Sequence, residues 1–404
     1  MYGMEASVQN ALPGAPFVLR QHLARPRRTI INACSSRAEE DRFAGRLSFS
    51  PAAEPCWDSV CSFHPIVLKE PSSGEWRMYF YGRNSSSWNS GVTPALLTSG
   101  RIGMACSRDG LLWTRTVGPL SDGAIMDPRD GATSGFDTVH VGCSDVLFHD
   151  GIWWMYYFGG GLEETALSTS RKVTGMRLRT GLAKSCGNGI DGFDNHRAME
   201  PILDVGEPGD WDEMMVAWAR VLPPSPMYLF SHWLMTYASM SMHATSAPGF
   251  CIGAAISQDG HSWMKVGKVL EQGESGSWDE AGVSRRHVIF WDGQFLMFYE
   301  GANKKGVHAI GLALSKDGLL WVKDKQGFDG EPGGPVFFAR VDCVEAWDSG
   351  SVACPHVVRR GDSLWLYYVG YDTTKKNSAF GVACSDGKNF RNFSRIGLIC
   401  FKDE

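Results

Sequence analysis

The chain has 404 residues, of which 43% are hydrophobic and 21% are charged, a composition typical of a folded globular protein. Its formal net charge of -5 gives no electrostatic reason to expect a nucleic-acid or anionic-membrane partner, and no apolar run reaches the roughly 18 residues of a membrane-spanning helix. The 11 cysteines include no CxxC pair, which favours reduced thiols in an intracellular protein over a zinc ribbon or a disulfide framework.

Residues 1–42 differ in composition from the rest of the chain. The first 37 residues carry five arginines against a single acid, Glu5, and they contain no continuous apolar core of a secretory signal. This arginine-rich, acid-poor composition is typical of a plastid or mitochondrial transit peptide; a basic leader without an address is the alternative. We therefore expect residues 1–42 to lie outside the fold and residues 43–404 to form a single domain.

One phrase recurs five times after the leader. It is an aromatic–Asp pair with a valine nine residues after the aspartate, and its copies begin at Trp57, Phe136, Trp211, Trp278 and Trp347. Each copy is followed by an aromatic-rich segment, then by a segment that usually ends in Asp-Gly, then by a short closing segment. Asp-Gly supplies the positive φ angles of tight hairpins, and the period-2 alternation predicts strands.

This repeat predicts an all-β, five-bladed β-propeller with four antiparallel strands per blade. No long amphipathic helix is expected after residue 43. The segment 46–55 precedes the first copy where the other copies have a fourth strand, so we predict that this N-terminal strand closes the ring. The aromatic residues of the second strands are expected to fill the space between neighbouring blades.

The blade rhythm, together with the Ser-x-Asp-Gly-x-x-Trp hairpins, resembles the glycoside hydrolases of the arabinanase, levansucrase and invertase type, especially family 43. The resemblance covers residues ~43–398. It implies that the repeated phrase is the channel-lining first strand of each blade, and that the active site is a funnel at one end of the channel.

The sequence departs from this family at the catalytic positions. The resemblance places a general base before a proline in the first blade, an aspartate in the third and a general acid in the fourth, and these positions fall on His64, Trp218 and Ser284. Only Asp145, in the second blade, matches an acidic position of the family. Because glycoside hydrolysis ordinarily needs two carboxyl groups, we expect ordinary glycosidase activity to be absent or feeble. The aspartate of the phrase occurs in every blade and is expected to have a structural role.

The candidate site consists of polar residues that differ from blade to blade. Positions seven and nine after the aromatic residue are expected to share one strand face, with His140 on the opposite parity. The predicted proton-transfer residues are His64, Asp145 and His287. The predicted substrate-binding residues are Arg220, Arg285, Arg286, His356, His140 and Trp218.

Three interpretations of this face stay open. In the first, Asp145 pairs with Arg220 and the histidines satisfy backbone groups. In the second, arginines and histidines bind a small anionic or sugar-like substrate, as in the related propeller phosphorylases, which need one acid because phosphate is the nucleophile. In the third, histidines hold a divalent metal on the axis near His356, where some family relatives carry an ion; no cofactor is otherwise implied. The corresponding functions are an atypical glycoside hydrolase-like enzyme, a glycoside phosphorylase-like enzyme, a non-catalytic glycan- or metabolite-binding propeller, and a scaffold.

Overall fold

The computed structural model describes residues 56–402, apart from short gaps at 87, 89–92, 131–134, 229, 243–248, 331, 344–345, 375–377, 386–387 and 399. The predicted leader and the predicted ring-closing segment 46–55 lie outside these residues. The described part is all-β, as predicted: it contains strands and two short 3-10 turns, η1 (Ser121–Gly123) and η2 (Phe328–Gly330). None of its helical segments is long and apolar enough to cross a membrane.

The strands pair in antiparallel groups that follow the copies of the phrase. Group 1 is β1 (Cys61–Lys69), β2 (Trp76–Arg83), β3 (Gly100–Ser107) and β4 (Leu112–Thr116). Group 2 is β5 (His140–His149), β6 (Ile152–Gly160) and β9 (Leu178–Ser185), with the small hairpin β7 (Thr165–Ser168) and β8 (Arg171–Val173) inserted. Group 3 is β10 (Met215–Leu222), β11 (Trp233–Met240), β12 (Phe250–Ser257) and β13 (Met264–Leu270). Group 4 is β14 (Gly282–Trp291), β15 (Gln294–Ala302), β16 (His308–Ser315) and β17 (Val322–Lys323). Group 5 is β18 (Ser351–Arg360), β19 (Ser363–Tyr371), β20 (Ser378–Ser385) and β21 (Ser394–Leu398).

The outer segment of group 2 differs from the prediction. The sequence predicts a fourth strand at 200–207, but there the described chain forms only an isolated bridge between Leu203 and Thr180, with a second bridge between Arg197 and Ala183. The longer connection that follows β9 in this copy carries the chain away from a regular pairing. The last strand of the chain, β22 (Cys400–Lys402), lies parallel to β4 and so returns to group 1.

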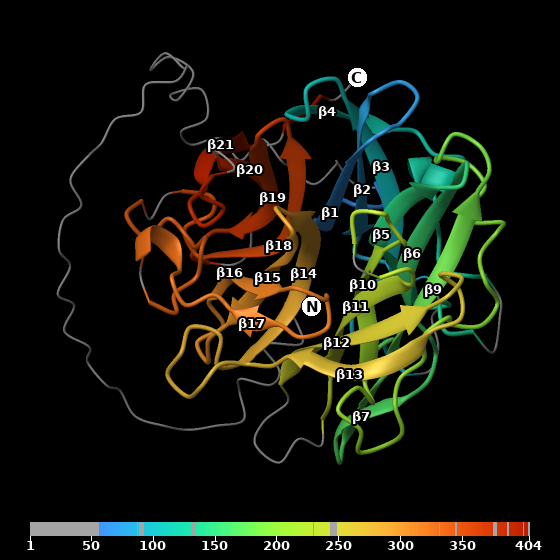
Figure 1. Cartoon of the computed structure of the whole chain (residues 1–404). Helices are drawn as coiled ribbons and strands as arrows, with labels where there is room; N and C mark the ends of the chain where they lie inside the picture. Colours follow the sequence, from blue (N-terminus) through green and yellow to red (C-terminus); the bar gives the residue numbers. More distant parts are fainter. Residues whose placement is uncertain are drawn as a thin grey trace. The chain divides into compact units, whose positions relative to one another are not determined.

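The first strands of the groups lie side by side. β1 contacts β5, β5 contacts β10, β10 contacts β14, β14 contacts β18, and β18 contacts β1 (Figure 1). Single parallel bridges connect group 2 to group 3 and group 3 to group 4, at Leu178–Met215 and Phe250–Gly282. The variable residues of the repeated phrase are therefore brought together by the first strands.

The aromatic–Asp pair fastens each group internally. In group 4, Trp278 stacks on Tyr299 with ring centroids 5.7 Å apart. Asp279 accepts hydrogen bonds from the Tyr299 hydroxyl at 3.1 Å and from Lys323 Nζ at 2.6 Å, so it joins the first strand region to β15 and β17. Gly311 makes room for the indole, because a Cβ at this position would lie 2.7 Å from the ring. Equivalent ion pairs of the phrase's aspartate to a basic residue occur at Asp58–Arg115, Asp137–Arg129, Asp212–Lys265 and Asp348–Arg395.

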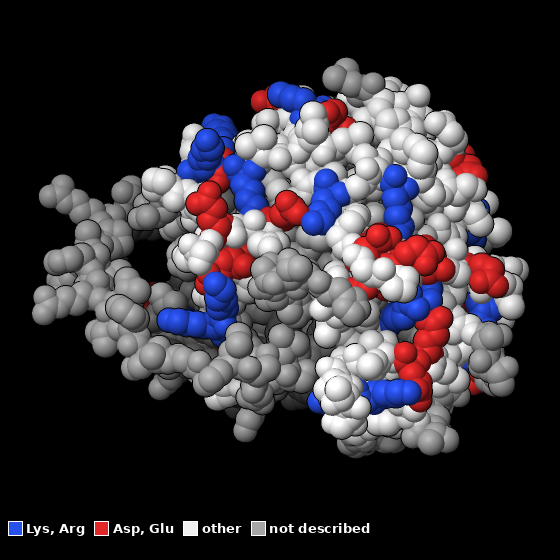
Figure 2. Space-filling view, turned by 90° about the horizontal axis from the view of Figure 1, so that it is seen from below, with Lys and Arg blue, Asp and Glu red and all other residues white. Residues whose placement is uncertain are grey.

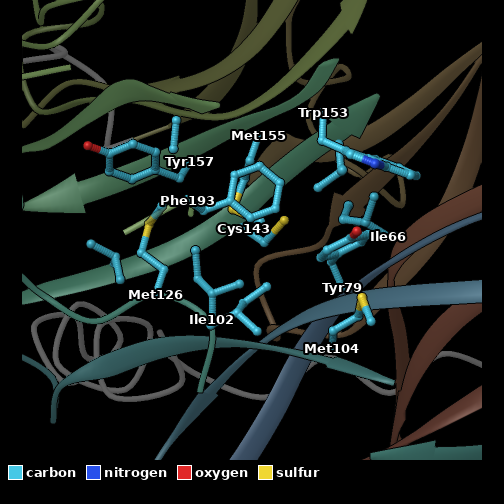
Figure 3. Packing of buried hydrophobic residues seen from close by; sticks show 14 of the residues in the cluster. Ile66, Tyr79, Ile102, Met104, Met126, Cys143, Trp153, Met155, Tyr157 and Phe193 are labelled. Carbon is cyan, nitrogen blue, oxygen red and sulfur yellow. The ribbon is translucent and has the colours of Figure 1, made fainter. Parts of the chain in front are cut away.

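The aromatic residues of the second strands pack between groups, as the repeat predicts. Figure 3 shows one such cluster, in which side chains of β2 and β3 interleave with those of β5 and β6. Tyr79 in this cluster also donates its hydroxyl proton to the Gly189 carbonyl of group 2, at 2.8 Å. Tyr367 of group 5 makes the same kind of bond to the Gly110 carbonyl of group 1, at 3.1 Å. Burying a large side chain in this way contributes about 1.5–3 kcal/mol.

Charge on the surface is mixed. On the face that Figure 2 shows, lysine and arginine side chains are interspersed with aspartate and glutamate side chains. The buried ion pairs, by contrast, lie inside the protein where the first strands meet.

Candidate functional site

Each first strand carries a β-bulge where the repeated phrase varies in sequence. The pairing with the second strand shifts register around positions seven and eight after the aromatic residue in all of these strands. His64, Trp218 and Cys354 lie there with φ angles of 57°, 49° and 53°, which is rare for residues with a side chain. A bulge inserts one residue and interrupts the alternation of faces. The prediction that positions seven and nine share one uninterrupted strand face is therefore wrong.

The position-nine side chains form what we call the axial cluster: Asp145, Arg220, His287 and His356. Arg220 pairs with Asp145, with Nη1 and Oδ1 3.0 Å apart, and its Nη2 lies 3.4 Å from His356 Nδ1. The His287 and His356 rings are in contact, with centroids 4.1 Å apart. All of these side chains are buried, so the structure brings four of the predicted site residues together.

Members of the axial cluster also bond the backbone of the neighbouring first strand. Asp145 Oδ2 accepts the Val221 N–H at 2.8 Å, and His287 Nδ1 accepts the Val357 N–H at 3.1 Å. Each acceptor comes from position nine and each donor from position ten of the next copy. The position-ten N–H groups are thus buried backbone donors, and the position-nine side chain of the preceding copy accepts their hydrogen bonds.

The hydrogen-bond partners of His356 and His64 lie on the backbone of neighbouring groups. His356 Nε2 lies 2.7 Å from the Val67 carbonyl and accepts the Val67 N–H at 3.1 Å, while its Nδ1 lies 3.4 Å from Arg220 Nη2, so Val67 offers the same ring nitrogen both an acceptor and a donor. His64 Nδ1 lies 2.9 Å from the Cys143 carbonyl and must be the donor there. His64 Nε2 therefore keeps its lone pair, and it is the position from which this residue could accept a proton.

Burial sets the protonation of these groups. It lowers the pKa of His64 to about 3, with Arg220 and nearby arginines adding to the effect, and it holds the pKa values of His287 and His356 well below their ordinary value. The histidines are neutral near pH 7. Burial raises the pKa of Asp145, although Arg220 and the Val221 N–H act in the opposite direction.

Arg285 belongs to a different cluster, centred on Glu300 of β15. Its Nη1 lies 2.7 and 2.9 Å from the two Glu300 carboxylate oxygens, which also bond His308 Nδ1 at 2.7 Å and the Cys354 N–H at 2.9 Å. Burial raises the pKa of Glu300, but Arg285, His308 and the Cys354 N–H outweigh it and hold the pKa at about 2. Glu300 is an ionised carboxylate.

Sequence reasoning missed Glu300, although a signal was present. At the same register the other second strands have Tyr81, Phe158, Ala238 and Val369, so the one acid in this set stands out against an otherwise apolar position. The alternation of the strand places it beside the bulge of β14, where Ser284 and Arg285 face it.

Three of the predicted residues lie apart from the axial cluster. Arg286 turns toward group 3, where its Nε donates to Thr236 Oγ1 at 3.1 Å, and its Nη1 is buried without a partner among the described residues. Trp218 lies under the Arg285 guanidinium, 4.6 Å from ring centroid to Cζ. His140 contacts the edge of Phe158, with ring centroids 6.3 Å apart.

The residues do not fit the metal ion considered near His356. Nowhere in the described ranges do three or more His, Cys, Asp or Glu side chains gather as ligands. His356 Nε2 is committed to the Val67 backbone and His287 Nδ1 to the Val357 N–H. Both ring nitrogens of His356 and Nδ1 of His287 are therefore used by the fold.

The comparisons with known proteins agree with this architecture. No protein-family model matches the sequence, and comparison with curated proteins finds no match. A glycoside hydrolase structure aligns with a TM-score of 0.61 at 18% identity, over 88% of this chain and 96% of that chain. A thermostable family-43 glycoside hydrolase aligns with a TM-score of 0.57 at 16% identity, over 87% and 97% of the two chains. The β-1,2-mannobiose phosphorylase of Listeria innocua aligns with a TM-score of 0.53 at 14% identity, over 80% and 88%. At these identities the likeness concerns the fold, and the chain has a glycoside hydrolase-like β fold.

Proposed function

We propose that the protein is a five-bladed propeller enzyme of glycoside-processing ancestry that acts on a small anionic or sugar-like substrate at its axis. The strand groups 1 to 5 would be the blades. Contacts between β18 and β1, the Tyr367–Gly110 bond and the pairing of β22 with β4 support a closed ring. The fold likeness to glycoside hydrolases and to a mannobiose phosphorylase supports the substrate class.

The observation that carries the proposal is the charge near the axis. Three guanidinium groups, of Arg220, Arg285 and Arg286, stand against two carboxylates, of Asp145 and Glu300, while the axial histidines are neutral. One positive charge is left over in a buried region. Buried charge is costly unless it is paired, so an anionic ligand would stabilise this arrangement.

Phosphorolysis is the reaction that a site with one proton-donating acid, Asp145, could perform. Ordinary hydrolysis needs two carboxyl groups, a general acid and a general base or nucleophile. The resemblance to family 43 puts three acidic positions of that family, these two roles and a supporting aspartate, at His64, Trp218 and Ser284, none of which is an acid. In phosphorolysis a phosphate oxygen bonds to the anomeric carbon as the glycosidic carbon–oxygen bond breaks, and the leaving oxygen takes one proton. Asp145 is the proposed donor of that proton in its acid form, which burial favours by raising its pKa; when Asp145 is protonated, the charge of Arg220 would be offset by the bound phosphate instead. His64 Nε2 and His287 are the other groups proposed to exchange protons at the axis.

The test is a phosphate-dependence assay on the purified full chain. Disaccharides, beginning with β-1,2-mannobiose, are incubated with and without inorganic phosphate, and sugar 1-phosphate and free sugar are both measured. Cleavage that requires phosphate and is lost in Asp145→Asn would support the proposal. Rapid phosphate-independent hydrolysis of aryl arabinofuranosides or xylosides would contradict it, because it would require the two-carboxylate machinery.

A binding propeller without turnover is the second candidate, and the histidine contacts favour it. His64, His287 and His356 each bond backbone through one nitrogen, which is what structural histidines do. In that case sugars or anions would raise the melting temperature without being converted, since a ligand that binds only the folded state stabilises it.

A further inference from the structure

Arg83 is a buried cation of group 1. It is the last residue of β2 and is 8% exposed. Its Nε donates to Cys61 Sγ at 3.3 Å, and its guanidinium lies 5.9 and 6.0 Å from the ring centroids of Phe63 and Tyr81. Within the described residues no carboxylate pairs with it. Sulfur and aromatic faces compensate a guanidinium less well than a carboxylate or phosphate does.

His140, the first residue of β5, is a second buried group without a partner. It is 2% exposed, and neither ring nitrogen has a hydrogen-bond partner among the described residues. The ring edge lies against Gly160, where a Cβ would be 2.4 Å from His140 Nε2. Burial, with Arg83 adding to it, lowers the pKa of His140 to about 3, so the ring is neutral and carries one N–H donor. Buried polar groups rarely stay unpaired, and each one needs an explanation.

The two groups belong to one aromatic layer at the starting ends of the first strands. Tyr81, which lies beside Arg83, contacts Phe158 with ring centroids 5.7 Å apart, and Phe158 in turn contacts His140. Arg77 and Arg286 are further guanidinium groups with a buried nitrogen that lacks a partner among the described residues; Arg77 donates to the Asn188 carbonyl and Arg286 to Thr236. Arg83 differs from them because it lies in the same aromatic layer as His140, which is a hydrogen-bond donor.

We propose that Arg83 and His140 form a subsite for an oxyanion, a carboxylate or a phosphate group, of the bound substrate. The planar guanidinium would hold two oxygens, the neutral imidazole would donate a further hydrogen bond, and Phe63 and Tyr81 would border the group. This inference rests on the proposed function and deepens it, because it names where the anionic part of the substrate binds. The subsite joins group 1 to group 2, and the axial cluster is a separate set of residues.

The experiment is isothermal titration of the full chain with inorganic phosphate, glucose 1-phosphate and glucuronate, with glucose as the neutral control. The unsubstituted protein should bind at least one of the three anions and bind glucose more weakly. Binding of phosphate alone identifies a free-phosphate site, preference for glucose 1-phosphate identifies a phosphate carried by the sugar, and preference for glucuronate identifies a carboxylate.

Arg83→Met keeps the aliphatic stem against the aromatic rings and removes the charge, so anion affinity should fall about tenfold or more. Arg83→Lys should retain part of the affinity, and His140→Phe should weaken binding several-fold. Arg359→Met and His149→Phe are matched controls, because Arg359 also lies over an aromatic ring and His149 also contacts aromatic rings, and both should bind as the unsubstituted protein does.

Failure of this subsite and failure of the proposed reaction are distinguishable. Unchanged anion affinity in Arg83→Met, or no anion binding by the unsubstituted protein at millimolar concentration, overturns the subsite. Anion binding that is lost in Arg83→Met while no substrate is turned over keeps the subsite and overturns the reaction. If Arg83→Met does not fold, Arg83→Lys and His140→Phe decide the question by the same titration.

Discussion

At the residue scale, the buried charges near the meeting point of the first strands include two ion pairs, together with Arg83 and Arg286, which pair with no carboxylate of the described residues. Asp145 with Arg220 is one pair, and Glu300 with Arg285 is the other. Arg83 has neither. Breaking a buried ion pair is costly, but a pair whose charges already compensate each other gains little from a ligand. An unpaired buried cation such as Arg83 is stabilised most when an anion binds to it. We therefore expect the Asp145–Arg220 and Glu300–Arg285 pairs to contribute to the stability of the fold, and Arg83 to contribute to binding of the proposed anionic group.

The Glu300–Arg285 pair leads to a stability prediction. Arg285 contacts both carboxylate oxygens of Glu300, which is 1% exposed. Removing either partner leaves the other charge buried and unpaired. We expect Arg285→Ala and Glu300→Gln each to lower the free energy of unfolding by about 3–5 kcal/mol, measured by urea denaturation. Near-unchanged stability in either variant would show that the pair is accessible to water and does not hold the fold.

The pKa shifts predict a loss of stability in acid that occurs in two stages. The neutral His64 ring, with its pKa at about 3, stabilises the fold above pH 6.5, and this contribution declines as the pH falls toward 3. The ionised Glu300, with its pKa at about 2 against an ordinary 4.5, stabilises the fold above pH 4.5, and its contribution of about 3 kcal/mol is lost as the pH falls toward 2.

Variants separate the two stages. His64→Gln should reduce the slope of unfolding free energy against pH between 6.5 and 3 by up to about 1.4 kcal/mol per pH unit, and it should retain the contribution of Glu300 between pH 4.5 and 2. Glu300→Gln should remove the later stage. Parallel curves for His64→Gln and the unsubstituted protein over the whole range would mean that His64 does not have the depressed pKa argued above.

At the element scale, each strand group is fastened by its own aromatic–Asp pair, which explains why the chain repeats the phrase. The aspartate accepts a hydrogen bond from a second-strand hydroxyl in several groups, and in groups 1, 3, 4 and 5 it pairs with a basic side chain of the fourth strand. In group 2 its partner is Arg129, which precedes the first strand. An element of two to five residues, such as β17, has few ladder bonds of its own and depends on such side-chain contacts.

Group 4 provides the test of this role. Asp279→Ala removes the acceptor of Tyr299 and Lys323 and leaves both polar groups without their partner, so the free energy of unfolding should fall by about 2–4 kcal/mol. Asp362→Ala, at an exposed turn, is the control and should change stability by less than about 0.5 kcal/mol. A small effect of Asp279→Ala, similar to the control, would show that stacking of Trp278 alone holds the group together. Thermal denaturation followed by circular dichroism measures both.

The same elements show what a sequence can and cannot predict. Strand order and inter-group packing follow from period-2 alternation and Asp-Gly turns, which are local signals. The bulges have no such signal, because His64, Trp218 and Cys354 adopt positive φ angles without being glycine, and their surroundings impose this conformation. An undetected bulge changes which side chains share a layer. The residues of the axial cluster could therefore be predicted from their asymmetry, and Glu300 could have been found as the one acid at its register, whereas the separation of Arg285 from the axial cluster could not.

At the scale of the whole molecule, the contacts between groups 5 and 1 decide whether the groups form one cooperative ring. His356 bonds the backbone of β1 at Val67, and Arg360 donates to the Asp109 carbonyl at 2.8 Å. These contacts join residues that lie 289 and 251 positions apart in the sequence. Sequence-distant contacts of this kind make unfolding of one group costly for the next, since each group buries its apolar face only against neighbours.

The last prediction concerns β22. It pairs in parallel with β4, so the end of the chain covers the outer edge of group 1. A chain that ends at residue 399 would expose that edge and lose the ladder bonds at Cys400, Phe401 and Lys402, each worth about 0.5–1.5 kcal/mol, so its melting temperature should fall by several degrees. Removing residues 1–42 instead should leave the melting temperature unchanged if the leader lies outside the fold, as its composition predicts. An unchanged melting temperature after removal of residues 400–404 would show that β22 adds nothing to closure, and a large drop after removal of residues 1–42 would show that the leader belongs to the fold.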